Sequence, residues 1–172
     1  RRRHTRFRNV TGVQTCALPI YGGGPGVFGR FAWNKKRGVS NIYMLLIGGG
    51  GDGNGTTGGG SGAVTVWYGA APNVPDSLFI SVGAKANPST VNYYTTSGTA
   101  NTLLTANGTA NQTGATAMTA NQFAASGFFQ SIAGQNGSTG NPGASATTFL
   151  QGGGAGLTTA NYGYQKIGRA HV

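Results

Sequence analysis

The chain has few of the side chains on which catalysis, metal binding and covalent cross-linking depend. Among its 172 residues there are two Asp+Glu, one Cys and two His, and both acidic residues are aspartate. A lone cysteine cannot form an intrachain disulfide, and zinc sites need several His or Cys ligands. The longest apolar run, residues 42–47, is far shorter than the roughly 18 residues of a membrane-spanning helix. We therefore expect no cofactor, no metal site and no membrane insertion.

Basic residues, in contrast, are abundant at the two ends of the chain. Lys+Arg number 12, for a formal net charge of +10, and basic arms of this kind often bind nucleic acid. However, residues 10–20, VTGVQTCALPI, match a translation of a short-read sequencing adapter, and residues 1–6 match the flow-cell primer that precedes it. Residues 167–172, IGRAHV, match the same adapter in the opposite orientation, and Lys166 lies on the junction. We interpret residues 1–20 and 166–172 as adapter-derived, and the fold prediction excludes them.

This interpretation changes the composition of the remaining stretch, residues 21–165. Cys16, His4 and His171 all lie in the adapter-derived ends, so the stretch between them has no cysteine, histidine or glutamate. Its net charge falls to +3, from Arg30, Lys35, Lys36, Arg37 and Lys85 against Asp52 and Asp76. Since general acid–base catalysis mostly uses the residue types that are missing, we predict that the protein is not an enzyme. We also expect no nucleic-acid partner.

Short runs of β-branched and aromatic residues, separated by glycine, proline and asparagine clusters, predict an all-β fold. The runs are residues 39–47, 63–68, 78–82, 91–95, 102–106, 128–132 and 147–150. No helical periodicity is sustained along the chain. We therefore expect residues 21–165 to form a single, truncated β-sandwich or jelly-roll-like domain with long glycine-rich loops.

The 33 glycines allow two interpretations. The tract at residues 48–62 could be a mobile loop, or it could pack as left-handed threefold polyglycine helices, because backbones without side chains can approach closely. The sequence alone leaves both open. Asn-Gly at residues 54–55, 107–108 and 136–137 favours type I′ turns, in which both residues have positive φ.

Two ligand motifs in this tract lack the context that they need. The spacing Gly53-x-Gly55-x-x-Gly58 matches a dinucleotide fingerprint, with Asp76 about twenty residues further on. That site needs a helix directly after the glycines, whereas more glycine and a strand-like run follow here. A calcium-binding β-roll needs tandem repeats rich in aspartate, and Asp52 stands alone in its tract.

One basic cluster remains outside the ends. Lys35, Lys36 and Arg37 follow Phe31 and Trp33, and basic side chains beside aromatic ones can hold a nucleic-acid backbone while the rings stack on bases. We favour a polar turn before the strand that starts at residue 39, with Trp33 anchoring the core.

Several motifs follow one another in an order that resembles the glycine-rich structural proteins of tailed phages. They are FAWNKKRG at residues 31–38, IYMLLIGGGG at 42–51, GGGSGA at 58–63, VPDSLFISVG at 74–83, IAGQNG at 132–137 and LQGGGAG at 150–156. The resemblance covers most of residues 21–156. It departs at Lys36, where proline is usual, and at residues 84–87, where more glycine is expected.

The resemblance implies a non-enzymatic virion protein of the tail-fibre or adhesin type, acting in host recognition. Its implied partners are other virion proteins and a host surface receptor such as a glycan, and the implied assembly is a homotrimer. An alternative is a secreted or surface-anchored bacterial glycine-rich structural protein. Trp67 and Tyr68 could stack on a sugar ring, although a core or edge role is more usual. We expect a receptor-contact loop to include Gly48, Gly51, Asp52, Asn54, Gly60, Trp67 and Tyr68.

Overall fold

Successive side chains of a β-strand point to opposite faces, so one face of a strand can be buried against the core while the other faces outward. The computed structural model describes residues 29–139, which contain seven strands and two short 3-10 helices. The strands are β1 (Gly29–Asn34), β2 (Asn41–Ile47), β3 (Val64–Ala70), β4 (Ser77–Val82), β5 (Ser89–Tyr94), β6 (Ala100–Ala106) and β7 (Phe128–Ile132); the helices are η1 (Ala71–Asn73) and η2 (Ala124–Ser126). The expected all-β class is confirmed.

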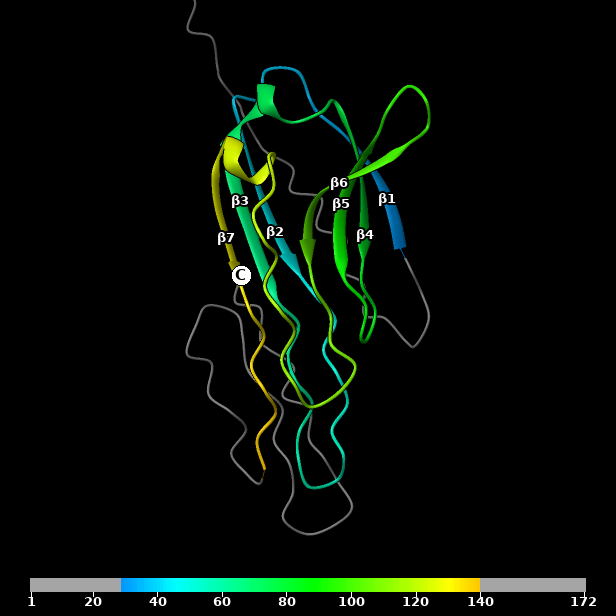
Figure 1. The fold of residues 1–172 in the computed structure, drawn as a ribbon. Coiled ribbons are helices and arrows are strands. Elements are labelled where there is room, and N and C mark those ends of the chain that lie inside the picture. The colour runs from blue at the N-terminus through cyan, green and yellow to red at the C-terminus, as the bar shows by residue number, and fades with distance from the viewer. Residues whose placement is uncertain (1–28, 140–172) are drawn as a thin grey trace, which may run out of the picture.

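The strands form two antiparallel sheets, which pack against each other (Figure 1). The four-stranded sheet has the order β1-β4-β5-β6, and the three-stranded sheet has the order β2-β3-β7. Both sheets supply the core: Ile42, Leu46 and Trp67 come from the three-stranded sheet, and Leu78 and Leu104 from the four-stranded one. The two-sheet arrangement is as predicted, and a jelly-roll connectivity stays a prediction.

Strand β2, whose unbroken apolar run is typical of a buried strand, is buried on one face only. Ile42 and Leu46 point into the core, whereas Tyr43, Leu45 and Ile47 are exposed. The reason is that the three-stranded sheet packs against the core with one face only, so the side chains on its other face, including Tyr68 of the central strand, are exposed. An unbroken apolar run therefore does not require burial on both faces.

Strand β1 is not among the predicted strands. Its six residues pair with β4, and Trp33 lies opposite Leu78. The turn that we expected over this stretch is confined to residues 37–38, and Trp33 does pack against the core. The sequence of this strand, GRFAWN, does not predict it, because glycine, arginine and asparagine interrupt the β-forming residues. The predicted strand at residues 147–150 and the adapter-derived ends lie outside the described residues.

Candidate functional site

Four segments that are far apart in sequence lie side by side at the end of the sandwich opposite η1 and η2 (Figure 1). We call residues 48–63, 83–88, 107–115 and 133–138 together the glycine-packed end. Their backbones hydrogen-bond to one another, as in the bonds Gly49 N to Asn87 O (3.0 Å), Gly60 N to Asn111 O (2.9 Å) and Ser61 N to Gln135 O (2.9 Å). Residues 48–51 bond to residues 60–63, 86–87 and 109. Residues 48–51 thus have three hydrogen-bonded neighbours, whereas a strand within a sheet has at most two. These segments therefore form a bundle and not a sheet.

The close approach of neighbouring backbones explains why glycine is needed in this bundle. A Cβ added to Gly48 would overlap the carbonyl oxygen of Asn107, and one added to Gly60 would overlap that of Thr113. Backbone conformation does not explain it, because the positive-φ glycines among residues 29–139 are Gly38, Gly55 and Gly98, and of these only Gly55 lies in the bundle. Of the two interpretations of the tract, the structure favours packed backbones over a mobile loop. Threefold helical geometry stays a prediction.

The predicted type I′ turns are wrong at all three Asn-Gly pairs. Gly55 has a φ of +79°, but Asn54 does not have a positive φ, and neither residue does at 107–108 or 136–137. At the latter two pairs the glycine serves packing, because a Cβ on Gly108 would lie 2.5 Å from Asn87 O and one on Gly137 would overlap Gly58 O. A local turn rule cannot detect a contact with a distant segment.

Polar side chains connect the tips of the segments. The Asp52 carboxylate forms an ion pair with Lys85, with Oδ2 and Nζ 2.5 Å apart. The backbone oxygen of Asp52 accepts a hydrogen bond from Gln112 Nε2 at 3.0 Å. Asn54 Oδ1 accepts from the backbone N–H of Thr57 at 3.0 Å. The Thr57 hydroxyl in turn lies 3.3 Å from that of Thr139. The tip surface is thus polar and close to neutral, and it is built from segments that only the fold brings together.

The structure separates the residues of the predicted contact loop. Gly48, Gly51 and Gly60 are buried in the glycine-packed end. Asp52 and Asn54 lie together at the tip of the first segment.

The two aromatic residues of that prediction lie elsewhere. Trp67 has 0% exposure and stacks on Phe123, with ring centroids 4.8 Å apart. Its interpretation as a core aromatic is confirmed, and it belongs to the core rather than to a contact loop. Tyr68 is 47% exposed, on the outer face of the three-stranded sheet between Tyr43 and Phe128.

The basic cluster contains one structural lysine. Lys35 Nζ donates hydrogen bonds to Ala71 O at 3.1 Å and Val74 O at 2.7 Å, and it pairs with Asp76 at 2.9 Å. Lys36 and Arg37 are exposed. Lys35 therefore ties the end of β1 to η1, as expected of a structural turn.

The carboxylates and the glycine motif that were weighed as catalytic, nucleotide or metal sites do not form such a site in the part that the structure describes. Asp52 and Asp76 pair with different lysines, at different ends of the sandwich. The glycine tract after Gly53 leads into strand β3, where a dinucleotide site would need a helix. Residues 29–139 hold no group of three or more His, Cys, Asp or Glu that could bind a metal. Within the same residues no helix has the length and apolar character needed to cross a membrane.

Taken together, these features define a two-sheet antiparallel β protein whose one end is built from packed glycine backbones. Comparisons of the chain with protein families, with curated proteins and with solved structures found no match.

Sequence reasoning did not find the long-range partners of Asp52 and Thr57 at the tip. Gln112 and Thr139 lie about sixty and eighty residues from the first tract, and no local pattern marks them. The only signal was indirect, since Asn, Gln or Thr stands beside Gly108, Gly114, Gly134 and Gly137.

Proposed function

We propose that this protein is a non-enzymatic virion component of the tail-fibre or adhesin type, which recognises a host surface receptor. The glycine-packed end serves as a support, and the tips of its segments form the contact surface. Other virion proteins and the receptor are its partners, and it assembles as a homotrimer in the virion.

The observation that carries this proposal is the way in which the tips are held. Turns on packed, mutually hydrogen-bonded backbones keep a fixed arrangement, and pre-organised surfaces lose less conformational entropy on binding. The tips present amide and hydroxyl groups with a single ion pair, which suits a receptor rich in hydroxyl groups. The order of glycine motifs, which resembles structural proteins of tailed phages, supports the placement in a virion.

The test has two parts. Mass spectrometry of virions purified from the source sample should detect peptides from residues 29–139. The purified protein should bind host cells and block adsorption of those virions. Absence from the particles together with failure to bind or block would overturn the proposal. Detection in a cell-surface fraction without virions would instead support the bacterial structural protein.

A matched pair of variants locates the contact surface. Thr56 is exposed in the tip that Asn54 and Thr57 form, and Thr96 is exposed in the hairpin between β5 and β6, at the opposite end. Thr56→Arg should abolish blocking of adsorption, because it places a bulky charge on the contact surface. Thr96→Arg adds the same charge and should leave blocking unchanged. Equal effects of the two would contradict a contact surface at the tips.

A further inference from the structure

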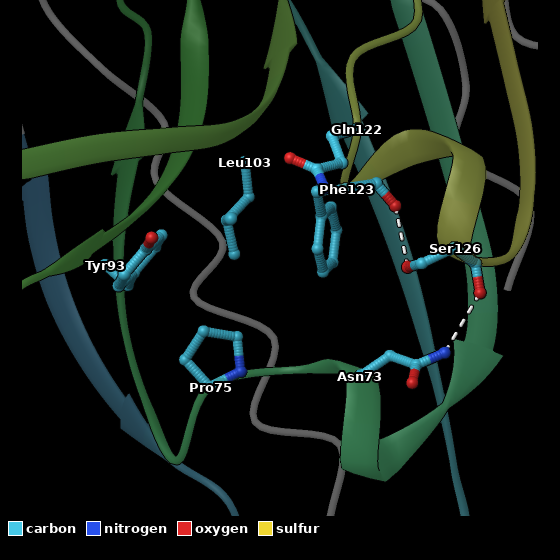
Figure 2. A pocket seen from close by; sticks show the side chains of 7 residues that line it. All are labelled: Asn73, Pro75, Tyr93, Leu103, Gln122, Phe123 and Ser126. Carbon is cyan, nitrogen blue, oxygen red and sulfur yellow. Dashed lines mark hydrogen bonds between the residues drawn. The ribbon is translucent and has the colours of Figure 1, made fainter.

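A groove opens at the end of the sandwich that carries η1 and η2, opposite the glycine-packed end. Its volume is about 410 Å³, which is within the range of about 300–1,000 Å³ that is typical of small-ligand sites. Figure 2 shows Tyr93 and Phe123 on either side of the opening, with Leu103 and Pro75 between them. Gln122, Asn73 and Ser126 line the remaining rim. None of the lining residues is charged.

The ring of Phe123 is held in place from below. It stacks on Trp67 with an interplanar angle of 26°. Trp67 is fixed in turn, because a Cβ on Gly69 or on Gly127 would lie within 3.0 Å of its indole ring atoms. One aromatic wall of the groove is therefore supported by the fully buried part of the core.

The polar rim is also partly fixed, and it leaves hydrogen-bonding groups free. Asn121 Nδ2 donates to Leu103 O at 2.9 Å and its Oδ1 accepts from Ala124 N at 2.8 Å, which positions the residues between them. Asn73 Nδ2 donates to Ser126 O at 3.0 Å. Within residues 29–139 the side-chain amide of Gln122 and the hydroxyl of Tyr93 have no hydrogen-bond partner. An amide offers two donors and one acceptor, and a phenol offers one of each.

We propose that this groove binds an uncharged saccharide. A sugar ring has an apolar C–H face that packs on aromatic rings such as Tyr93 and Phe123, and hydroxyl groups that amides such as Gln122 and Asn73 can bind. A phosphorylated or sulfated ligand would find no cation among the lining residues, and a hydrocarbon would leave the rim amides without partners. This site lies at the opposite end from the proposed receptor surface, and it does not depend on the virion assignment.

Nuclear magnetic resonance titration of the full chain tests the site directly. The probes are a panel of neutral mono- and oligosaccharides, their sulfated or sialylated counterparts, and an alkyl detergent without a sugar headgroup. Neutral saccharides should shift the amide signals of Asn73, Gln122 and Ser126 in a saturable manner. No shift with any neutral saccharide, or shifts with the anionic probes or the detergent alone, would overturn the proposal.

Three variants distinguish binding from folding. Gln122→Ala should weaken binding roughly fivefold, the effect of losing one hydrogen bond, and Gln130→Ala, an exposed glutamine on β7, should have no effect. Tyr93→Leu keeps an apolar side chain and should weaken binding roughly fivefold by removing one aromatic wall. If Gln122→Ala and Tyr93→Leu bind as the unaltered protein does, the proposal is wrong. If the unaltered protein binds none of the neutral saccharides but still blocks adsorption, the groove proposal alone is wrong and the proposed function stands.

Discussion

At the scale of single residues, two physically different groups can be distinguished among the glycines of residues 29–139. Gly38, Gly55 and Gly98 have positive φ, and a Cβ on any of them would meet nothing within 4 Å. Gly48 and Gly60, inside the glycine-packed end, do not have positive φ, and a Cβ on either would overlap a backbone oxygen of another segment. The two groups should respond differently to the same substitution, because one would suffer strain and the other overlap.

Gly60→Ala should lower the free energy of unfolding by at least about 2 kcal/mol, since the new methyl group would force two backbones apart. Gly98→Ala adds the same atoms in open space and should cost only about 1 kcal/mol of left-handed strain. Urea denaturation of both variants measures the difference. Equal losses would contradict the packing of the bundle.

Ala86 shows the converse case. It has a φ of +66° and is the one described non-glycine residue with positive φ, and it lies in residues 84–87, where the resemblance to phage proteins led us to expect more glycine. Ala86→Gly should raise the free energy of unfolding by about 0.5 kcal/mol, because it relieves about 1 kcal/mol of strain and costs part of that in chain entropy.

The control for this change is Ala84→Gly, where φ is not positive. It should lower stability by about 0.5 kcal/mol. Thermal unfolding of the two variants measures both changes in stability. If Ala84→Gly stabilised the protein and Ala86→Gly destabilised it, the inferred backbone strain at Ala86 would be contradicted.

At the scale of elements, the first glycine segment should behave as ordered structure although it belongs to no strand. The amides of Gly51, Gly58 and Gly60 donate to carbonyl groups of other segments or of the same bundle. We expect hydrogen exchange to be slow at these amides and fast at Gly53 and Gly55, which are exposed and have no hydrogen bond within the described residues. Uniformly fast exchange over residues 48–60 would show the mobile loop that the sequence also allowed.

The outer face of the three-stranded sheet carries an aromatic row. Tyr68 on the central strand lies opposite Tyr43 on one side and Phe128 on the other. Each cross-strand pair contributes about 0.2–1 kcal/mol relative to alanine. Tyr68→Ala removes two such pairs and should destabilise the protein more than Tyr43→Ala or Phe128→Ala, each of which removes one.

A double-mutant cycle on Tyr68 and Phe128, followed by urea unfolding, isolates the coupling between these two rings. A coupling energy of zero, or a smaller loss for Tyr68→Ala than for either edge variant, would contradict the predicted order.

At the scale of the whole molecule, the two ends differ in construction. The glycine-packed end is held by backbone hydrogen bonds between segments, whereas the opposite end carries the uncharged groove beside η1 and η2. Each end has one ion pair, Asp52 with Lys85 at the glycine-packed end and Asp76 with Lys35 at the opposite end. The strong positive charge of the chain comes from residues 1–20 and 166–172.

A variant without those residues should therefore lose most of its retention on a heparin column, as its net charge falls from +10 to +3, because charge-driven retention follows the density of basic residues. Its circular dichroism spectrum should keep the β signature. In the full chain, Lys36→Ala with Arg37→Ala should change retention only slightly. Unchanged retention after removal of the ends would assign nucleic-acid or polyanion affinity to the remaining stretch.

Much of the fold follows from local pattern. The strands at residues 128–132 and 78–82 were predicted to within one residue, because β-branched and aromatic residues between turn-forming residues have few other stable arrangements. The strand at residues 29–34 was missed, since its pairing with β4 stabilises residues of weak intrinsic preference. Asp52 and Asn54 were predicted as exposed site residues, whereas Trp67 was placed both in the core and on the surface.

By itself, the sequence determined the all-β class, most strands and the absence of His, Cys and Glu between the two ends, because these depend on residue type and short-range periodicity. Only the tertiary structure decided which face of β2 is buried, that glycines such as Gly48 and Gly60 permit the close approach of two backbones, and that Tyr93, Gln122 and Phe123 line one groove. These features arise where segments 20 to 80 residues apart meet, and a periodicity within one segment carries no information about its neighbours in space.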